Sequence, residues 1–303
     1  MGRLVCLGEI MVELAPAKDG LFQRGFAGDT FNTAWYARRI LPPHWQVSYA
    51  TMLGNDPVSD EMVQFINKAD IHTDLIQRHP DRTAGLYMIT LNEGERSFSY
   101  WRSQSAARCL ADDESWLAHA LQAASMAYMS GITLAILSPD RRKALCAALA
   151  AARAAGTTIV FDTNLRLNLW GGADQARAGL LAGAGVADVV LPSFDEEQML
   201  FGDETPSDTI ARYRSKGARI IAVKNGANPC TIWSPEFQFE HHPPKAEQID
   251  STAAGDSFGA GIVAGLAQSL PLDQTVKRAC ALAARVISSP GALVPNATKE
   301  MTL

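Results

Sequence analysis

Short apolar runs alternate with longer amphipathic or alanine-rich stretches along most of the chain. Six of the apolar runs have the length of buried strands, at residues 4–7, 47–52, 126–129, 158–161, 189–191 and 220–223. Four of the stretches between them are amphipathic or alanine-rich and have the length of helices, at residues 57–69, 114–124, 139–155 and 205–216. Strands that alternate with helices predict an α/β fold, in which helices cover both faces of a mainly parallel sheet.

Two segments depart from this alternation and predict β-hairpins. Residues 10–26 have apolar stretches around a turn at 17–20, and residues 85–102 have alternating stretches around a turn at 92–95. Hairpins inserted into an α/β chain suggest a small separate sheet, a β lid formed by about 10–33 and 85–108. The alternative is that they are edge strands of the main sheet. We expect residues 1–303 to form one domain with this lid inserted.

The composition fits an ordinary globular protein of the cytoplasm. The chain has 303 residues, with 27 Lys or Arg and 32 Asp or Glu, so its formal net charge is -5. This acidic balance gives no electrostatic reason to expect nucleic-acid binding. No apolar run approaches the roughly 18 residues of a membrane span, so we expect no membrane partner. The five cysteines form no Cys-x-x-Cys pair, which argues against a zinc site or a disulfide framework.

The segment 250–261, Asp-Ser-Thr-Ala-Ala-Gly-Asp-Ser-Phe-Gly-Ala-Gly, carries the clearest chemistry. A turn of small residues precedes a helical pattern, so the N–H groups of Ala253, Ala254, Gly255 and Asp256 are predicted to lack helical partners. With the helix dipole, they favour a phosphate or a developing anion. Asp256 could accept a proton from a substrate hydroxyl there, or it could serve only as a helix cap.

Two segments of the chain resemble the signatures of a known family. Residues 250–263 resemble the C-terminal signature of the PfkB (ribokinase-like) sugar kinases, and Gly8-Glu9 with residues 27–34 resembles the first signature. The resemblance spans residues 4–295. Within the family the chain is most similar to the 2-keto-3-deoxygluconate kinases, on the residues Gly28-Asp29-Thr30, Gly94-Glu95-Arg96, Tyr100-Trp101-Arg102 and Ser130-Gly131-Ile132. No P-loop or Gly-x-Gly-x-x-Gly motif is present.

The resemblance implies a ribokinase-like three-layer α/β/α sandwich and ATP-dependent phosphorylation of a sugar hydroxyl. Asp256 would be the general base, and the N–H groups of Ala253, Ala254 and Gly255 would hold the transferring phosphoryl group. The substrate residues would be Gly28, Asp29, Thr30, Asn32, Tyr87, Tyr100, Arg102 and Arg166. The ATP residues would be Asn164, Ser193, Lys224, Gly226, Ala227 and Asn228. Glu196 would act on Mg²⁺ through water, and Asp250 and Thr252 would line a site for a monovalent cation such as K⁺.

Arginine points to the substrate class, because its planar fork matches a carboxylate with two parallel donors. Arg102 ends the second hairpin and Arg166 follows a core strand, so both could reach one acid group. The arginines fit an acid sugar, and the resemblance implies 2-keto-3-deoxygluconate as the substrate. Another sugar kinase such as a fructokinase, a catalytically silent sugar-binding regulator, and a structural protein without a site remain alternatives. Uncovered lid strands also suggest a homodimer or a higher homo-oligomer.

Overall fold

The main sheet of the computed structural model, which describes residues 2–92, 95–299 and 301, confirms the predicted α/β class. Its strand order is β13-β12-β11-β10-β9-β8-β1-β4-β5. The strands are β1 (Arg3–Leu7), β4 (Gln46–Gly54), β5 (Ile76–His79), β8 (Met126–Ser130), β9 (Thr158–Asp162), β10 (Val189–Leu191), β11 (Ile220–Val223), β12 (Cys230–Trp233) and β13 (Gln238–His241). All six predicted strands are present. Neighbouring strands pair in parallel from β5 to β11. At the other edge, β12 pairs antiparallel with both β11 and β13.

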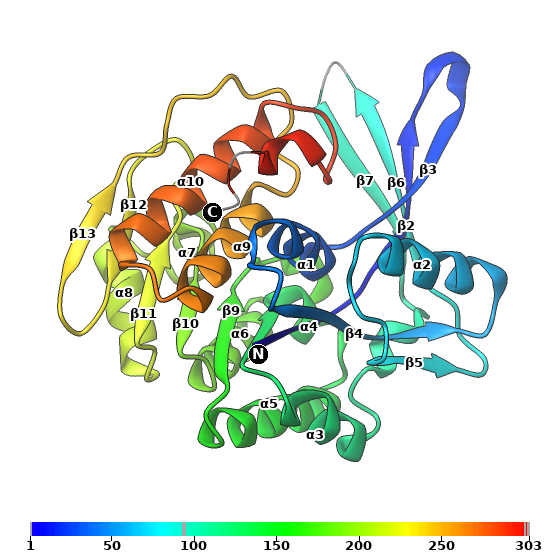
Figure 1. Cartoon of the computed structure of the whole chain (residues 1–303), viewed down its shortest axis with the longest axis horizontal. Coiled ribbons are helices and arrows are strands. Elements are labelled where there is room, and N and C mark those ends of the chain that lie inside the picture. The colour runs from blue at the N-terminus through cyan, green and yellow to red at the C-terminus, as the bar shows by residue number, and fades with distance from the viewer. Residues whose placement is uncertain (1, 93–94, 300, 302–303) are drawn as a thin grey trace.

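Helices cover both faces of this sheet, which gives three layers (Figure 1). One face carries α1 (Asp29–Ile40), α2 (Pro57–Lys68), α9 (Ala254–Ala267) and α10 (Leu272–Ile287). The other carries α3 (Glu114–Gln122), α4 (Gly131–Ile136), α5 (Pro139–Ala154), α6 (Ala173–Gly185), α7 (Phe194–Phe201) and α8 (Pro206–Ser215). Strand β1 shows why: Leu4 and Cys6 are buried in the first of these apolar clusters, whereas Val5 and Leu7 are buried in the second.

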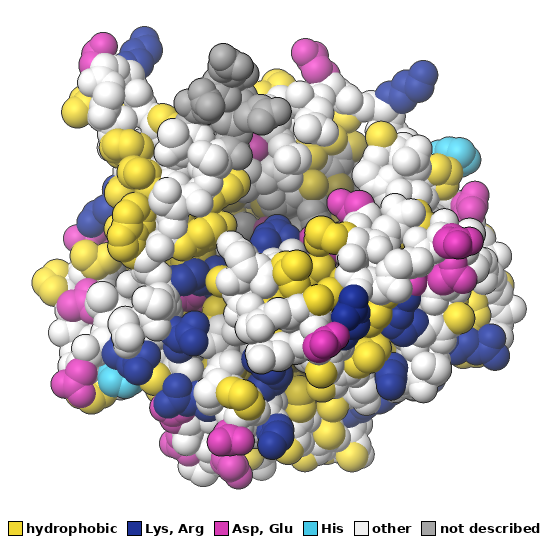
Figure 2. All heavy atoms as spheres, turned by 180° about the vertical axis from the view of Figure 1, so that it is seen from behind, with side chains coloured by type: hydrophobic (Ala, Val, Ile, Leu, Met, Phe, Trp, Pro, Cys, Tyr) yellow, Lys and Arg dark blue, Asp and Glu magenta, His cyan; other side chains and the backbone are white. Residues whose placement is uncertain are grey.

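The two predicted hairpins pair with each other in a separate sheet, which we call the lid sheet. It consists of β3 (Phe22–Ala27), β2 (Met11–Pro16), β6 (Gly85–Asn92) and β7 (Glu95–Trp101), in that order. The strands project from the main body in Figure 1, and Figure 2 shows the molecule hollowed between them and the rest of the chain. The hairpins are therefore not edge strands of the main sheet. Glu93 and Gly94, at the centre of the predicted second turn, lie outside the described residues.

The lid sheet is smaller than the predicted segments 10–33 and 85–108. Residues 29–33 begin α1, because the N–H of Asn32 donates to the carbonyl of Gly28 at 2.7 Å and starts the helix. At the other end, residues 106–109 form a 3-10 turn in which Ala106 and Cys109 pack against Met52 of β4. Both ends therefore belong to the main body. Within the described part of the chain, no helix is long and apolar enough to span a bilayer.

Candidate active site

Helix α9 begins with a turn that supports part of the predicted anion site. Its N-terminal cap is Ala253, whose backbone is left-handed with φ 62°. The N–H of Ala254 donates to the carbonyl of Ser251 at 3.2 Å, so this predicted anion donor already has an acceptor. Among the described residues, no acceptor is found for the N–H of Ala253 or Gly255. The predicted set of three donors is therefore corrected to two.

Asp256 lies in the first turn of α9 and is held by α1, from the opposite end of the chain. The side-chain amide of Asn32 donates to Oδ2 of Asp256 at 2.8 Å, and the hydroxyl of Thr33 donates to its backbone carbonyl at 3.1 Å. Burial raises the pKa of Asp256 well above its usual value, and the nearby carboxylate of Asp29 raises it further. The structure thus brings the predicted base and Asn32 together.

Asp29, Asn164 and the two arginines form a second group beside Asp256. The amide of Asn164, a predicted ATP residue, donates to Oδ2 of Asp29, a predicted substrate residue, at 2.9 Å. Burial raises the pKa of Asp29, while a hydrogen bond from Ser130 and the charges of Arg102 and Arg166 oppose this rise. Both predicted arginines therefore act electrostatically on one carboxyl group at the sugar end.

Each of these arginines is already paired with a glutamate. Arg102 is buried and donates from Nε to Oε2 of Glu9 at 2.8 Å. Arg166 is half exposed, and its Nη1 donates to Oε1 of Glu196 at 3.0 Å. Burial raises the pKa of Glu196, and the N–H of Leu165, which donates to its Oε2 at 2.9 Å, opposes this. Glu196, predicted to act on magnesium through water, is thus also the partner of a substrate residue.

The lid sheet supplies Tyr87 and Tyr100, which face each other across β6 and β7. Their ring centroids are 6.0 Å apart, and the hydroxyl of Tyr87 donates to the carboxylate of Glu13. The charge of Asp256 contributes to raising the pKa of Tyr87, after burial and Glu13, so this tyrosine lies within electrostatic reach of the base. Both predicted tyrosines are therefore placed on the lid sheet, with Tyr87 near the transfer site.

Thr30 is the predicted substrate residue that the structure removes from the site. Its side chain is fully buried, and its hydroxyl hydrogen-bonds that of Tyr49 at 3.0 Å. In a helix, residues two positions apart point to different faces, so the face that presents Asn32 to Asp256 turns Thr30 into the core. The N–H of Gly28 donates to the side-chain oxygen of Asn32 at 3.4 Å, and a role of Gly28 in substrate binding stays a prediction.

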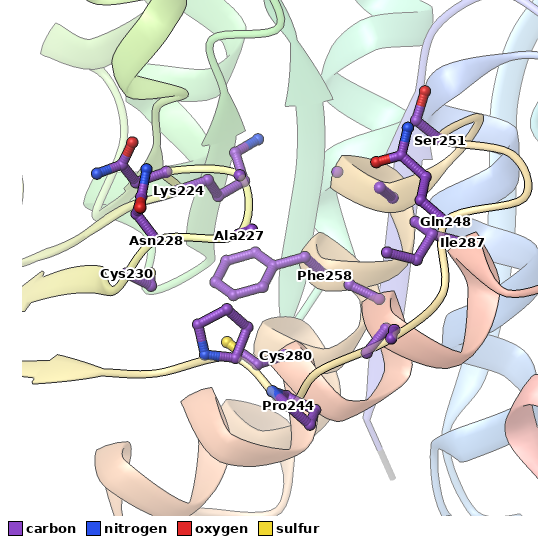
Figure 3. A pocket seen from close by; sticks show the side chains of 18 of the residues that line it. Lys224, Ala227, Asn228, Cys230, Pro244, Gln248, Ser251, Phe258, Cys280 and Ile287 are labelled. Atoms are coloured by element: carbon purple, nitrogen blue, oxygen red, sulfur yellow. The ribbon is translucent and has the colours of Figure 1, made fainter.

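A pocket of about 760 Å³ adjoins the start of α9 (Figure 3). Its lining includes the predicted ATP residues Ser193, Lys224, Gly226, Ala227 and Asn228, together with the turn residues Ala254 and Gly255. An apolar part is formed by side chains that the sequence analysis did not select, namely Pro244, Phe258, Cys280, Ala283 and Ile287. Phe258 projects from α9 toward the loop that begins at Lys224. Except for Phe258, which lies within the 250–263 signature, these residues belong to no motif, so only the fold brings them together.

Lys224 places a positive charge beside the turn. Its ammonium group donates to both carboxylate oxygens of Asp162 at 2.8 Å, and a Cβ placed on Gly255 would lie 3.4 Å from Nζ. Asp162 ends β9 and was not predicted as a site residue. Polar groups at the carboxyl end of a parallel strand face the ligand crevice of an α/β fold, and this rule could have identified Asp162 from the sequence.

Asp250 and Thr252 hold the loop that leads into α9. Oδ1 of Asp250 accepts hydrogen bonds from the backbone N–H of Thr252 at 3.0 Å and from its hydroxyl at 2.7 Å. Oδ2 accepts from the N–H of Gly291 at 2.6 Å. These contacts explain the loop geometry, and a role in binding a monovalent cation stays a prediction.

Residues 1–299 of the chain match the pfkB family carbohydrate kinases. The chain belongs to this family. The predicted membership and the predicted ribokinase-like α/β fold are thus confirmed, and the chain is a carbohydrate kinase.

Similar pfkB proteins cover nearly the whole chain. A 2-dehydro-3-deoxygluconokinase of Escherichia coli (strain K12) is 36% identical over 302 residues, which is 97% of each chain. One of Dickeya dadantii is 35% identical over 300 residues, 96% of each. A PfkB protein from Polaromonas sp. JS666 superposes with a TM-score of 0.82 at 26% identity, over 96% of this chain and 98% of that one. A fructokinase with bound ATP from Xylella fastidiosa has a TM-score of 0.85 at 22% identity, over 99% and 97%.

The donor set of this pfkB chain suits a metal that arrives with phosphates rather than a resident one. In the described part of the chain, no group of three or more His, Cys, Asp or Glu side chains could hold a metal ion. Mg²⁺ typically binds through one or two carboxylates, waters and substrate phosphates. Oxygen ligands of that kind, Asp162 and Glu196, flank the loop of Asn164, and the charge of Asp162 is among those that act on Glu196. The residues therefore fit Mg²⁺ bound to a nucleotide.

Proposed function

We propose that this carbohydrate kinase transfers the γ-phosphoryl group of ATP to 2-keto-3-deoxygluconate, yielding 2-keto-3-deoxy-6-phosphogluconate. The observation that carries the substrate is the pair of guanidiniums, Arg102 and Arg166, whose charges both act on the carboxyl group of Asp29. The names of the relatives at 35–36% identity support the same substrate. An acid sugar would place its carboxylate toward the arginines and its terminal hydroxyl toward Asp256.

ATP would occupy the 760 Å³ pocket with its phosphates at the start of α9. The apolar part around Phe258 and Ile287 suits the base, because ligand pockets combine apolar walls with a few polar groups. Lys224 and Gly255 lie at the other part of the lining, where phosphate charge would be favoured. Lys224, Gly226, Ala227, Asn228 and Ser193 would contact the nucleotide.

In the reaction, the ionised Asp256 would accept the proton of the substrate hydroxyl as that oxygen attacks phosphorus. The N–H groups of Ala253 and Gly255 and the ammonium of Lys224 would stabilise charge on the transferring group. Asn32 would keep the base oriented through its hydrogen bond to Oδ2. Mg²⁺ bound to ATP would neutralise phosphate charge, with Glu196 acting through water. Asp250 and Thr252 are proposed to line a K⁺ site.

A fructokinase activity is the second candidate, and one observation favours it. Glu9 and Glu196 already neutralise the two arginines, which weakens their attraction for an anion. Against this, Arg166 uses only Nη1 to donate to Glu196 and to the carbonyl of Leu165. Its other nitrogens take no part in these two bonds. A silent regulator is disfavoured because Asp256 and Asn32 form a complete, oriented base.

The deciding experiment measures ADP release by the purified chain with a panel of sugars and keto-acids. We expect turnover with 2-keto-3-deoxygluconate at a kcat/KM far above that for fructose, and only when both ATP and Mg²⁺ are present. A higher kcat/KM for fructose would overturn the acid-sugar assignment. Absence of turnover with every sugar would favour the regulator. Because the net charge is -5 and the described cysteines are unpaired, we also propose a cytoplasmic enzyme.

A further inference from the structure

A buried ion pair joins the main sheet to the lid sheet beside the site. Glu9, just after β1, is 2% exposed, and Arg102, just after β7, is 7% exposed. Nε of Arg102 donates to Oε2 of Glu9 at 2.8 Å, and Nη2 donates to the same oxygen. The second oxygen, Oε1, is buried without a hydrogen-bond partner among the described residues.

Stability does not explain this pair. Replacing a buried ion pair with apolar side chains of similar volume is often neutral or stabilising. An unpartnered carboxylate oxygen in the interior is a further cost. The surrounding chain nevertheless leaves room for Glu9: a Cβ on Gly85 would lie 2.7 Å from Oε1 and 3.1 Å from Cβ of Arg102. A site that holds a costly charge pair in a glycine-lined space calls for a functional explanation.

The pair uses one edge of the guanidinium and leaves the other unengaged by Glu9. A guanidinium presents a side edge, Nε with Nη2, and an end edge, Nη1 with Nη2, each able to face a carboxylate. Both bonds to Glu9 come from the side edge. The ring centroid of Tyr100 lies 5.7 Å from the guanidinium carbon. The charge of Arg102 also helps to keep the pKa of Asp29 from rising further, so the guanidinium lies at the sugar end.

We propose that Glu9 is a positioning residue for the acid sugar, holding Arg102 by its side edge so that the end edge faces the substrate carboxylate. The inference rests on the proposed function. Glu9 touches no reacting atom, and its effect is on binding of the acid end. A guanidinium held this way loses little conformational freedom when the substrate binds, because the anchoring bond has already fixed its direction.

The test compares steady-state kinetics of wild type and Glu9→Gln, which keeps the side-chain shape and removes the charge. We expect KM for 2-keto-3-deoxygluconate to rise about tenfold, a change of ~1.4 kcal/mol, because charge-assisted bonds are about twice as strong as neutral ones. We expect kcat and KM for ATP to stay within about twofold. Glu61→Gln is the matched control, since Glu61 pairs with Arg24 of the lid sheet in a partly exposed ion pair.

Repeating Glu9→Gln in an Arg102→Ala background separates positioning from a general structural effect. If Glu9 acts through Arg102, the second substitution changes KM by less than about twofold there. An equal rise in KM in both backgrounds, or none in the wild-type background, would overturn the proposal. Should Glu9→Gln not fold, Gly85→Ala displaces the same carboxylate and is expected to raise the same KM with kcat nearly unchanged; an unchanged KM would refute the inference. A wild type inactive on 2-keto-3-deoxygluconate would instead contradict the proposed function.

Discussion

Burial of Asp256, the proposed base, lowers the stability of the folded chain at neutral pH. It is buried near Asp29 and Asp162, which together keep its pKa well above normal, burial being the largest cause. The folded chain therefore keeps this proton up to a higher pH than the unfolded chain, which releases it above about pH 4. Stability falls as the pH rises from there toward the raised pKa. The same burial removes water from the proton acceptor.

We expect Asp256→Asn to lower kcat by about 100-fold or more, the usual scale for loss of a general base. The variant should also melt at a higher temperature than wild type at neutral pH, because the amide carries no charge that burial disfavours. The two melting temperatures should converge below about pH 4, where Asp256 is protonated in both the folded and the unfolded wild type. Calorimetry across pH checks this, and a difference in melting temperature that does not grow as the pH rises would contradict it.

Arg166 tests the substrate assignment at the same scale. Arg166→Ala is expected to raise KM for 2-keto-3-deoxygluconate by roughly 30-fold or more, since truncating one side of a desolvated charge pair costs ~2 kcal/mol or more. Arg102→Ala should act similarly. KM for fructose and for ATP should change much less. Arg166→Lys is the control, because it keeps the charge but loses the planar fork and should recover only part of the affinity.

Equal losses of acid-sugar and fructose activity in both alanine variants would show that the arginines do not read a carboxylate. The sequence could indicate these side chains by residue type and place in the chain. It could not show that each already has a glutamate partner, because Glu9 and Arg102 are 93 positions apart. The prediction that Thr30 binds substrate was wrong for a related reason. A motif identifies residues but does not show which face of a helix each one occupies.

At the scale of the element, the turn before α9 is held in an uncommon conformation. Ala253 is left-handed, a conformation that costs a non-glycine residue about 1–2 kcal/mol. Ala254, the next residue, is the first helical one. Substitution by glycine is therefore expected to change the folding stability in opposite directions at Ala253 and Ala254.

We expect Ala253→Gly to stabilise the fold by about 0.5–1 kcal/mol, since relief of the strain exceeds the added entropy of the unfolded chain. Ala254→Gly, the matched control, should destabilise it by a similar amount because its backbone is already helical. Urea unfolding of the two variants measures both signs. Destabilisation by both substitutions would show that the turn stores no strain.

Elements were predictable where their pattern was long or repeated. The alternation of the lid strands and the apolar runs of the parallel strands identified both sheets. The strands β5, β12 and β13 were missed because polar residues interrupt each of them, so none contains a continuous apolar run. The wall formed by α10 was missed too, since Cys280 and Ile287 line the pocket through packing that no local pattern encodes.

At the scale of the whole molecule, the lid sheet exposes apolar surface that a second copy of the chain would cover. Leu21 is 67% exposed, Phe22 47% and Trp101 57%. Yellow side chains gather on this part of the molecule in Figure 2. Exposed apolar residues gathered on one part of a surface mark interaction sites. We propose a homodimer, or a higher homo-oligomer, through the lid sheet.

Sedimentation velocity is expected to give at least a dimer for wild type and a monomer for the double variant Phe22→Lys, Trp101→Glu, because buried unpaired charges disfavour the contact. Met199→Glu is the control: Met199 is 64% exposed on α7, away from the lid sheet, and its variant should keep the wild-type state. A monomeric wild type at micromolar concentration would refute the lid contact.

Asn32 and Asp256, which are joined by a hydrogen bond, are 224 positions apart in the chain. During synthesis, Asn32 therefore emerges from the ribosome long before Asp256. Strand β1 likewise pairs with β8, which is synthesised more than a hundred residues later. Until α9 and α10 have been synthesised, the side of α1 that packs against α9 has no cover, and the hydroxyl of Tyr36 lacks the carbonyl of Ala292 to which it donates. Such long-range pairing slows folding. A chain that ends before α9 would therefore be prone to aggregation and would lack Asp256, the proposed base. Phosphoryl transfer would require the chain to be complete through α9 and α10.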